Sequence, residues 1–530
     1  MSLTSMNFIL FCLVLLIIYY VVPKRLQWGI LLAASLYFYC MTGVKNVIFV
    51  LITSFTTYLA TGQIQKLHDS QKAWLKENKK TASREEKTAH KTAINKKQKL
   101  YMILTLLINF GIMCTFKYVH FAIEQANAVI GAFHGEPITD TIQWIVPLGV
   151  SFYTFQTMGY LVDVYWGKVE AEKNYLKVLL FVSFFPQMTQ GPISNFKELT
   201  TELFKEHTFT YKRFSWGAQR MIWGYFKKLV VANIFSVWVN DVFANYNEYT
   251  GITVLCGAFM YSIEIYADFS GYMDIICGFS EILDIKLAEN FEQPYFSKSV
   301  AEYWRRWHIT LGAWFKTYIY YPIAVAKWNR NIGKAAQGKL GKTFGQTVPA
   351  SIALVVVWLA TGLWHGASWA YIAWGGVNGL FIIASLWLEP VNKYIKDKLH
   401  IKDTDRPFII FQIVRTFILV TFIKVLPEVG TLSQGWGLWK RIFTEHTIHA
   451  SFHGILPFIT EGYTFYAAML GLVLIFVTDL IQVKQPVREW MEKHVPYIIR
   501  ICIYAGFCVL IGYFSYQLSD SAGGFMYAQF

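Results

Sequence analysis

Residues 355–379 read VVVWLATGLWHGASWAYIAWGGVNG. An apolar run of helical length leads up to His365, which is followed by a run of Trp, Gly and Ala. Ionisable side chains are costly inside such segments, so His365 is a candidate functional residue by default. Burial disfavours the charged form of an imidazole, so we expect a neutral His365 that can accept a proton from a hydroxyl. A core histidine that is hydrogen-bonded across helices is the alternative, and this segment alone does not separate the two.

Glycines are frequent on both sides of this histidine. They have no side chain, so they let two helices, or a helix and a substrate, approach closely. The glycines concerned are Gly362, Gly366, Gly375, Gly376 and Gly379. The pattern therefore predicts a place near His365 where helices, or a helix and a substrate, come close together.

A second unusual segment lies upstream, where residues 301–321 read AEYWRRWHITLGAWFKTYIYY. It is too polar for a simple spanning helix and too aromatic for a soluble loop, which favours a re-entrant or interfacial segment. Its paired arginines could hold phosphate or carboxylate groups of a donor through forked hydrogen bonds. Interfacial anchoring by snorkelling side chains is the alternative. The candidate residues in this segment are Trp304, Arg305, Arg306, Trp307 and His308.

Three carboxylates interrupt the otherwise apolar residues 261–285, namely Glu264, Asp268 and Asp274. The first two are four residues apart and share a helical face. We expect these two carboxylates to pair with Arg305 or Arg306 and to fix that segment. This structural role is favoured over direct catalysis, because unpaired carboxylates are costly in a membrane.

Apolar segments recur along the whole chain, which is 55% hydrophobic and only 15% charged. A membrane-spanning helix needs about 20 mostly apolar residues, and by that measure the chain holds roughly ten to thirteen spans. The pattern predicts an all-α, multi-pass protein of the plasma membrane in one body, 1–530. The candidate spans are 7–22, 27–43, 46–62, 101–119, 142–166, 176–192, 214–243, 251–280, 346–366, 369–388, 408–427, 462–483 and 497–517.

The net charge of +14 is distributed between the apolar runs. Residues 66–99 carry eleven Lys or Arg and four Asp or Glu, and residues 324–345 carry five basic residues and no acidic one. The positive-inside rule predicts that both segments are cytoplasmic and that the N-terminus is extracytoplasmic, on an uncleaved first span. The distribution does not favour nucleic-acid binding. The segment 66–99 could be an exposed helix or a disordered loop. Its role would be to set the topology as a solvated face, or else to bind anionic lipid or a cytosolic partner.

The cysteines and two polar or proline-containing segments give further information on the class of protein. The seven cysteines lie in apolar stretches without a C-x-x-C pair, so we expect no disulfide framework and no metal site. Residues 184–195 (FFPQMTQGPISN) contain helix-breaking prolines, and residues 146–165 are rich in small polar residues and tyrosines. Both segments could line a tunnel, or serve helix packing.

These motifs together resemble the membrane-bound O-acyltransferases. The resemblance rests on YWRRWHITLGAWFKTYIYYPI (303–323), LWHGASW (363–369) and WGGVNG (374–379), in that order and spacing. Further likeness lies in VPLGVSFYTFQ (146–156), FFPQMTQGPI (184–193), YADFSGYMDI (266–275) and FMYAQF (525–530). The motifs are similar to those of the bacterial branch that acetylates alginate, although KVLP in residues 422–439 stands where relatives often carry a Phe-Arg pair.

The resemblance implies a ring of about eleven spanning helices, with re-entrant helices, around a central funnel. Residues 146–390 would be the catalytic core and 391–530 the C-terminal helices. The histidine of the WHG motif is catalytic in that family and corresponds to His365, while the RRWH histidine corresponds to His308. His308 would orient the donor or stabilise charge on the thioester oxygen. Arg305 and Arg306 would bind the donor, with Trp304, Trp307, Trp364 and Asn378 lining its site.

The activity implied is transfer of an acyl group, most simply acetyl, from a cytoplasmic thioester to an extracytoplasmic polysaccharide or cell-wall polymer. Acetyl-CoA or an acyl carrier protein would be the donor, no cofactor would stay bound, and a secreted or membrane-anchored esterase-like protein would be the partner. D-alanyl transfer from a carrier protein to teichoic acid is one alternative. A transporter for polymer or lipid and a non-enzymatic scaffold are alternatives from other classes.

Overall fold

The computed structural model describes residues 2–41, 43–133, 138, 146–445 and 462–518. Their regular structure is helical, and within these ranges the isolated antiparallel bridge between Phe291 and Trp307 is the extent of β pairing. The all-α prediction is therefore confirmed for the described residues. The predicted motif at residues 525–530 lies outside them.

Eight helices in the described part of the chain are long and apolar enough to cross a membrane. Several other expected spans are shorter helices, such as the 16 residues of α1. The candidate span 176–192 is interrupted, because α6 ends at Ser183 and Phe185–Met188 form a separate short turn. The prolines predicted to break this segment account for its interruption. The eight helices are α3 (Val47–Glu77), α4 (Arg84–Ala132), α11 (Gly251–Ile282), α15 (Lys327–His365), α16 (Trp369–Trp387), α18 (Arg406–Val425), α21 (Tyr463–Gln482) and α23 (Tyr497–Gln517).

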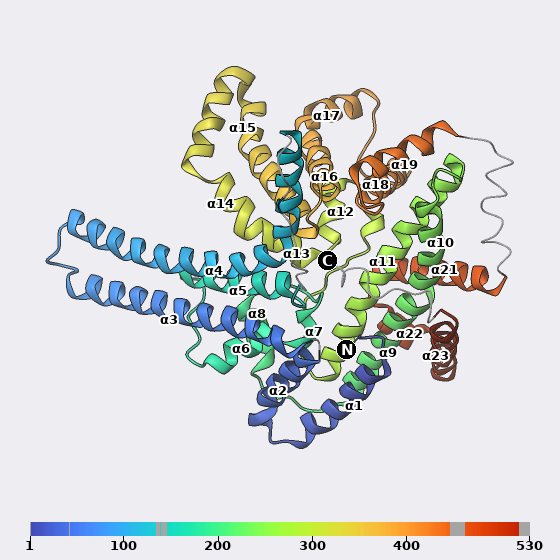
Figure 1. The fold of residues 1–530 in the computed structure, drawn as a ribbon, viewed down its shortest axis with the longest axis horizontal. Helices are drawn as coiled ribbons and strands as arrows, with labels where there is room; N and C mark the ends of the chain where they lie inside the picture. The colour runs from blue at the N-terminus through green and yellow to red at the C-terminus, as the bar shows by residue number, and fades with distance from the viewer. Residues whose placement is uncertain (1, 42, 134–137, 139–145, 446–461, 519–530) are drawn as a thin grey trace. The chain divides into compact units, whose positions relative to one another are not determined.

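The chain divides into two compact units, which we describe separately. The first comprises Met1–Phe214 and Ser280–Leu287. Its helices α3 and α4 lie side by side as a long antiparallel hairpin (Figure 1). Ser83 and Glu86 form a reciprocal capping box that begins α4, so most of the basic segment 66–99 is helical. The shorter helices of this unit are α1 (Met6–Val21), α2 (Gln27–Cys40), α5 (Val150–Tyr165), α6 (Tyr175–Ser183), α7 (Phe185–Met188) and α8 (Phe196–Leu203).

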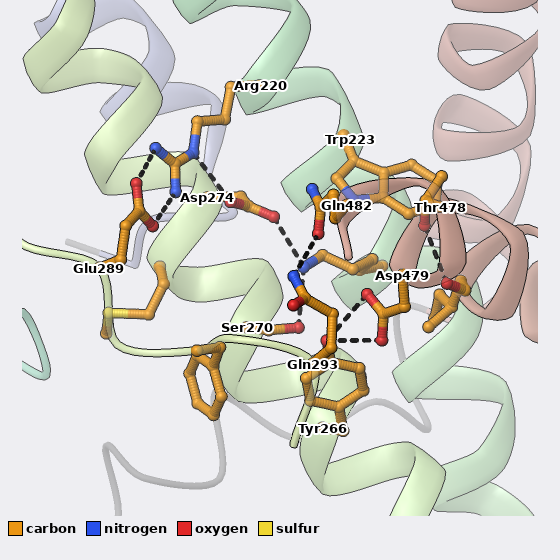
Figure 2. Close-up of a pocket in the computed structure, with 14 residues that line it drawn as sticks. Arg220, Trp223, Tyr266, Ser270, Asp274, Glu289, Gln293, Thr478, Asp479 and Gln482 are labelled. Carbon is orange, nitrogen blue, oxygen red and sulfur yellow. Dashed lines mark hydrogen bonds and ion pairs between the residues drawn. The ribbon is translucent and has the colours of Figure 1, made fainter. Parts of the chain in front are cut away.

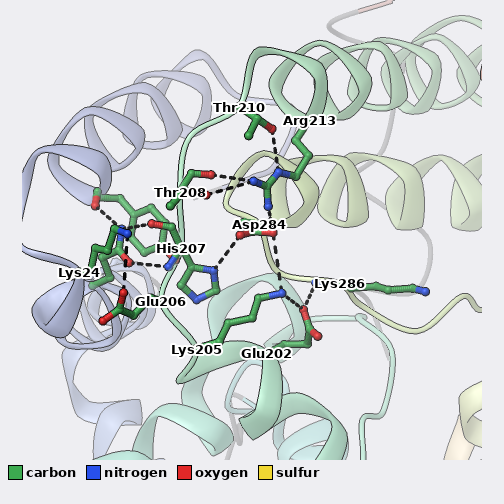
Figure 3. Close-up of polar contacts among 12 residues, drawn as sticks. Lys24, Glu202, Lys205, Glu206, His207, Thr208, Thr210, Arg213, Asp284 and Lys286 are labelled. Carbon is green, nitrogen blue, oxygen red and sulfur yellow. Dashed lines mark hydrogen bonds and ion pairs between the residues drawn. The ribbon is translucent and has the colours of Figure 1, made fainter.

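A polar cluster in the first unit joins residues 202–213 to the chain just after α11 (Figure 3). Asp284 forms ion pairs with Arg213 and, at 3.8 Å, with Lys205. The ring of His207 lies 3.7 Å from the same carboxylate, and only 1% of its side chain is exposed. Burial lowers the pKa of His207, although the neighbouring Asp284 acts in the opposite direction. The carboxylate of Asp284 therefore holds the segment 205–213 against the residues that follow α11.

The second unit comprises Ser215–Phe279 and Ala288–Phe530 and contains all three motifs of the sequence analysis. Its π-helical segment η3 (Lys227–Ala232) interrupts the run from α9 to α10, a distortion that is frequent at functional sites. The basic residues expected in a loop at 324–345 lie mostly in the first part of α15, which is bent at Gly341 (φ 80°). Besides the long helices, this unit contains α9 (Tyr211–Phe226), α10 (Asn233–Ala244), η4 (Pro294–Phe296), α12 (Val300–Arg306), α13 (Ile309–Phe315), η5 (Lys316–Tyr320), α14 (Tyr321–Ala324), α17 (Glu389–Lys398), α19 (Leu432–Thr444) and α22 (Val487–His494).

Helices α15 and α16 form a closely packed hairpin around residues 362–375. A Cβ atom on Gly362 would lie 2.4 Å from the carbonyl oxygen of Tyr371, and one on Gly375 would lie 2.3 Å from that of Trp358. Neither position has room for a side chain, as the glycine pattern predicts. Gly376 differs, since the nearest atom to its added Cβ is 3.8 Å away, on Leu359. The close approach fixes the end of α15, which is His365.

Candidate active site

His365 is the last residue of α15 and lies among aromatic rings of its own hairpin. Only 5% of the residue is exposed. Its ring centroid is 4.9 Å from that of Trp364 and 5.0 Å from that of Trp374, and Tyr371 lies nearly parallel to it at 6.4 Å. The chain leaves the helix at Gly366, where a Cβ atom would meet the Tyr371 ring at 2.2 Å. The WHG sequence thus ends the helix where the imidazole is enclosed on several sides.

His308 lies between α12 and α13 in a left-handed backbone conformation, with φ 48° and ψ 51°. This conformation is uncommon for a residue other than glycine, and such strain clusters at functional sites. The flanking backbone holds it in place, because Ile309 N donates to the carbonyl of Asn290 at 3.1 Å. The Thr310 hydroxyl donates to the side-chain oxygen of the same asparagine at 2.7 Å. Hydrogen bonds to Asn290 therefore hold the backbone that directly follows His308.

The His308 ring is buried, with 2% of the residue exposed. It contacts the ring of Phe269 at 4.9 Å and that of Trp364 at 6.2 Å. Burial lowers the pKa of this imidazole to about 3, so His308 is neutral at pH 7. Since Trp364 also contacts His365, the structure brings the two candidate histidines to the same indole.

Trp304 and Asn378 were predicted as site residues from two separate motifs, and the structure joins them directly. The indole N–H of Trp304 donates to the side-chain oxygen of Asn378 at 2.9 Å. The Asn378 amide in turn donates to the carbonyl of Trp374 at 2.9 Å. The Trp304 ring also packs against Trp358 and Trp374, at 5.0 Å and 5.5 Å. This contact fixes α12 against the α15–α16 hairpin.

The paired arginines differ in their surroundings. Arg306 forms an ion pair with Glu302 at 2.8 Å. Arg305 is exposed and has neither a hydrogen bond nor an ion pair within the described residues. Trp307 is 2% exposed and packs into a cluster of aromatic rings, so its surface is occupied by protein contacts.

The expected pairing of Glu264 and Asp268 with Arg305 or Arg306 is not found within the described residues. Asp268 pairs with Lys228 at 2.6 Å, and Asp274 pairs with Lys227 at 2.7 Å. The π-helical segment η3 supplies both lysines, which explains the different partners. Glu264 is 4% exposed and forms no ion pair within 4 Å in the described part of the chain.

Asp274 belongs to a larger polar network around a cavity of about 70 Å³ (Figure 2). Arg220 donates to Asp274 and, through two nitrogens, to Glu289. On the opposite side, the Tyr266 hydroxyl donates to Asp479 at 2.9 Å. A cavity of this volume and polarity has room for water molecules. Neither candidate histidine lines it, and its polar side chains bond largely to one another.

Sequence reasoning did not single out this network. The signal was present, because Lys227 and Lys228 stand inside the apolar candidate span 214–243. Ionisable residues in such a segment call for a partner of opposite charge. The same rule applies to Lys424, which stands inside the apolar candidate span 408–427 and is 4% exposed.

Comparison with protein families matches residues 172–336 to the membrane-bound O-acyltransferase family. The matched region contains the RRWH segment and the acidic residues of α11. This part of the chain is similar to that family. A multi-pass membrane protein agrees both with this similarity and with the eight long apolar helices of the described residues.

Curated relatives extend the similarity to a larger part of the chain. The probable alginate O-acetylase of Pseudomonas aeruginosa is 33% identical over 344 residues, which are 65% of this chain and 60% of that protein. The peptidoglycan O-acetyltransferase of Helicobacter pylori is 31% identical, over 55% of this chain and 56% of that protein. The teichoic acid D-alanyltransferase of Streptococcus thermophilus is 26% identical, over 47% and 60%. The chain thus spans less than two thirds of the length of these relatives.

Proposed function

We propose that this protein transfers an acetyl group from a cytoplasmic thioester to a hydroxyl of an extracytoplasmic polysaccharide or cell-wall polymer. The observation that carries the proposal is the convergence of His308 and His365 on the indole of Trp364. Two relatives whose names state O-acetylation of alginate and of peptidoglycan support the choice of acetyl and of a polymeric acceptor.

In the proposed reaction, His365 accepts the proton of the acceptor hydroxyl while the hydroxyl oxygen attacks the thioester carbonyl carbon. The carbon–sulfur bond then breaks, and the imidazolium returns the proton to the leaving thiolate. Positioned general-base catalysis of this kind contributes about 10²–10⁴-fold to the rate. Covalent relay of the acyl group on His365 is the variant of this mechanism in which the imidazole itself is the nucleophile.

The role proposed for His308 follows from its neutral state. A neutral imidazole carries one N–H, which can donate a hydrogen bond to the thioester oxygen as negative charge develops there. Its burial and its fixed left-handed backbone mean that little reorganisation accompanies the reaction. We propose that His308 orients the donor and stabilises this oxygen.

Donor recognition is assigned to the exposed end of α12. Both acetyl-CoA and a phosphopantetheine-bearing carrier protein are anionic, and a guanidinium binds phosphate through paired hydrogen bonds. Arg305 is exposed, so it would make that contact. Arg306 is paired with Glu302, so it would act on the anionic donor only through its positive charge. Trp304, Trp364 and Asn378 would line the path of the acyl group, with Trp307 behind it.

The proposal includes a path to the site from both sides of the membrane. Residues 146–390 would form the catalytic core within a ring of about eleven spanning helices around a central funnel. The basic segments 66–99 and 324–345 would face the cytoplasm, and the N-terminus the outside. Since 5% of His365 and 2% of His308 are exposed, aromatic side chains around them must move when substrates bind. A secreted or membrane-anchored esterase-like partner would receive the acetyl group or present the polymer.

The test uses the purified full-length protein with acetyl-CoA labelled in the acetyl group, and with alginate or peptidoglycan fragments as acceptors. We expect label on the acceptor with the natural protein and at least about a 100-fold lower rate with His365→Ala. A D-alanyl-loaded carrier protein tests the alternative suggested by the teichoic acid D-alanyltransferase relative. Equal rates for the natural protein and His365→Ala, at equal folding, would remove the proposed role.

A further inference from the structure

Lys424 lies in the last turn of α18 and is almost completely buried, with 4% of the residue exposed. Its ammonium donates a hydrogen bond to the hydroxyl oxygen of Tyr295 at 2.8 Å. The same nitrogen lies 4.1 Å from the ring centroid of Trp307, 4.8 Å from that of Tyr295 and 5.1 Å from that of Tyr303. The three rings form an aromatic cage around one ammonium.

The cage takes the place of an acidic partner. Within the described residues no carboxylate lies within 4 Å of the Lys424 nitrogen, in contrast to Lys227 and Lys228. A buried ammonium is costly unless its charge is compensated, and aromatic faces attract cations most strongly where water is absent. An apolar side chain of similar length would fill this space at a lower cost. Packing alone therefore does not explain a lysine here. Its directional contacts, which orient the Tyr295 and Trp307 side chains, explain it better.

The caging rings belong to the segment that carries His308. Trp307 immediately precedes it, and Tyr303 accepts the backbone hydrogen bond of Trp307 at 2.8 Å. The Tyr295 hydroxyl also donates to the backbone carbonyl of Ser262 on α11. That helix carries Phe269, whose ring contacts the His308 imidazole at 4.9 Å. Lys424 thus connects the elements on either side of His308.

We propose that Lys424 is a positioning residue for His308. Its ammonium orients the face of Trp307 and thereby holds the adjacent left-handed backbone, with φ 48°, that directs the imidazole. The effect of Lys424 on the rate of acetyl transfer rests on the proposed function. The placement of the His308 ring is independent of that function and can be measured separately.

The first measurement observes the imidazole directly. Protein labelled with ¹⁵N-histidine is reconstituted in bilayers, and the His308 signal is identified by its loss in His308→Gln. We expect Lys424→Met, which keeps the length of the side chain and removes its charge, to shift the His308 signal. Lys424→Arg should largely restore it. Lys440→Met is the matched control, because Lys440 is exposed on α19, and it should leave the signal in place.

The second measurement uses acetyl transfer. We expect Lys424→Met to lower kcat at least about tenfold with little change in the KM for the donor, since slight misplacement of a catalytic group is costly. The double variant with His308→Ala should be no slower than His308→Ala alone, because both changes act through one imidazole. Single effects that multiply in the double variant, or an unchanged His308 signal in Lys424→Met, would overturn the proposal.

The proposal can also be tested if Lys424→Met does not fold, or if the natural protein transfers no acetyl group. If Lys424→Met does not fold, Tyr295→Phe keeps the ring and removes the hydroxyl that accepts from the lysine. We expect the His308 signal to shift in that variant as well, and an unchanged signal counts against the proposal. If the natural protein transfers no acetyl group, the proposed function fails, and the ¹⁵N signal alone decides the positioning role.

Discussion

The indole nitrogen of Trp304 lies 2.9 Å from the side-chain oxygen of Asn378 and donates a hydrogen bond to it. The two residues are separated by 74 positions and belong to the two motifs that each hold a candidate histidine. Asn378 is 1% exposed, so neither water nor another described residue replaces this bond readily. The contact sets the distance between α12, which leads to His308, and the hairpin that ends at His365.

Replacing Asn378 by Leu should separate activity from folding. The change keeps a similar volume but leaves the Trp304 N–H without its acceptor, which costs about 1–3 kcal/mol in a buried site. We expect a lower thermal unfolding midpoint and a reduced kcat for acetyl transfer, measured on protein in detergent. Trp304→Phe removes the donor, so Trp304→Phe combined with Asn378→Leu should be less destabilised than the sum of the two single changes. A double variant as unstable as the sum of both changes would contradict the pairing.

The glycine pair at the α15–α16 crossing gives a second prediction. In Gly375→Ala the added methyl group would lie 2.3 Å from the carbonyl oxygen of Trp358, so the helices must move apart. We expect a loss of about 1–3 kcal/mol in stability, typical of overpacking, seen as a lower unfolding midpoint. Gly376→Ala is the matched control on the same helix, because its nearest contact is 3.8 Å away and alanine favours a helix over glycine. Equal destabilisation by both changes would argue against close packing as the cause.

Much of this arrangement could be predicted from local sequence. His365 and His308 stood out because ionisable residues are rare in apolar segments, and the glycines predicted a close helix pair. The long helices followed from the length of the apolar runs. These properties depend on neighbours within one helix or one hairpin.

The rest depends on contacts between distant segments. The partners of Asp268 and Asp274 could not be assigned, because a π-helical segment brings Lys227 and Lys228 beside α11. The left-handed backbone at His308 is flanked by hydrogen bonds to residues 290 and 292, and it has no signature in its own sequence. The cage around Lys424 likewise draws its rings from a segment more than a hundred residues away.

Arg305 provides a test of donor recognition. It is exposed and without an ionic partner in the described residues, whereas Arg306 is bound to Glu302. We expect Arg305→Gln to raise the KM for the anionic donor, with a small effect on kcat and on thermal stability. Added salt should weaken donor binding by the natural protein more than by this variant, because salt screens the attraction between Arg305 and the donor, which the variant lacks. Lys440→Gln, at an exposed position of α19, serves as the control for a general change of surface charge.

The buried imidazole of His308 makes stability depend on pH in a defined direction. Burial lowers its pKa from 6.5 to about 3, so between these values the unfolded chain binds a proton that the folded protein does not. Stability from this group is complete above about pH 6.5 and is lost as the pH falls towards 3, by about 1.4 kcal/mol per pH unit. We expect the unfolding midpoint to decrease from pH 7 to pH 5, and to decrease less steeply in His308→Gln, which cannot take up that proton. An identical pH dependence in the two proteins would show that His308 is not held neutral by its burial.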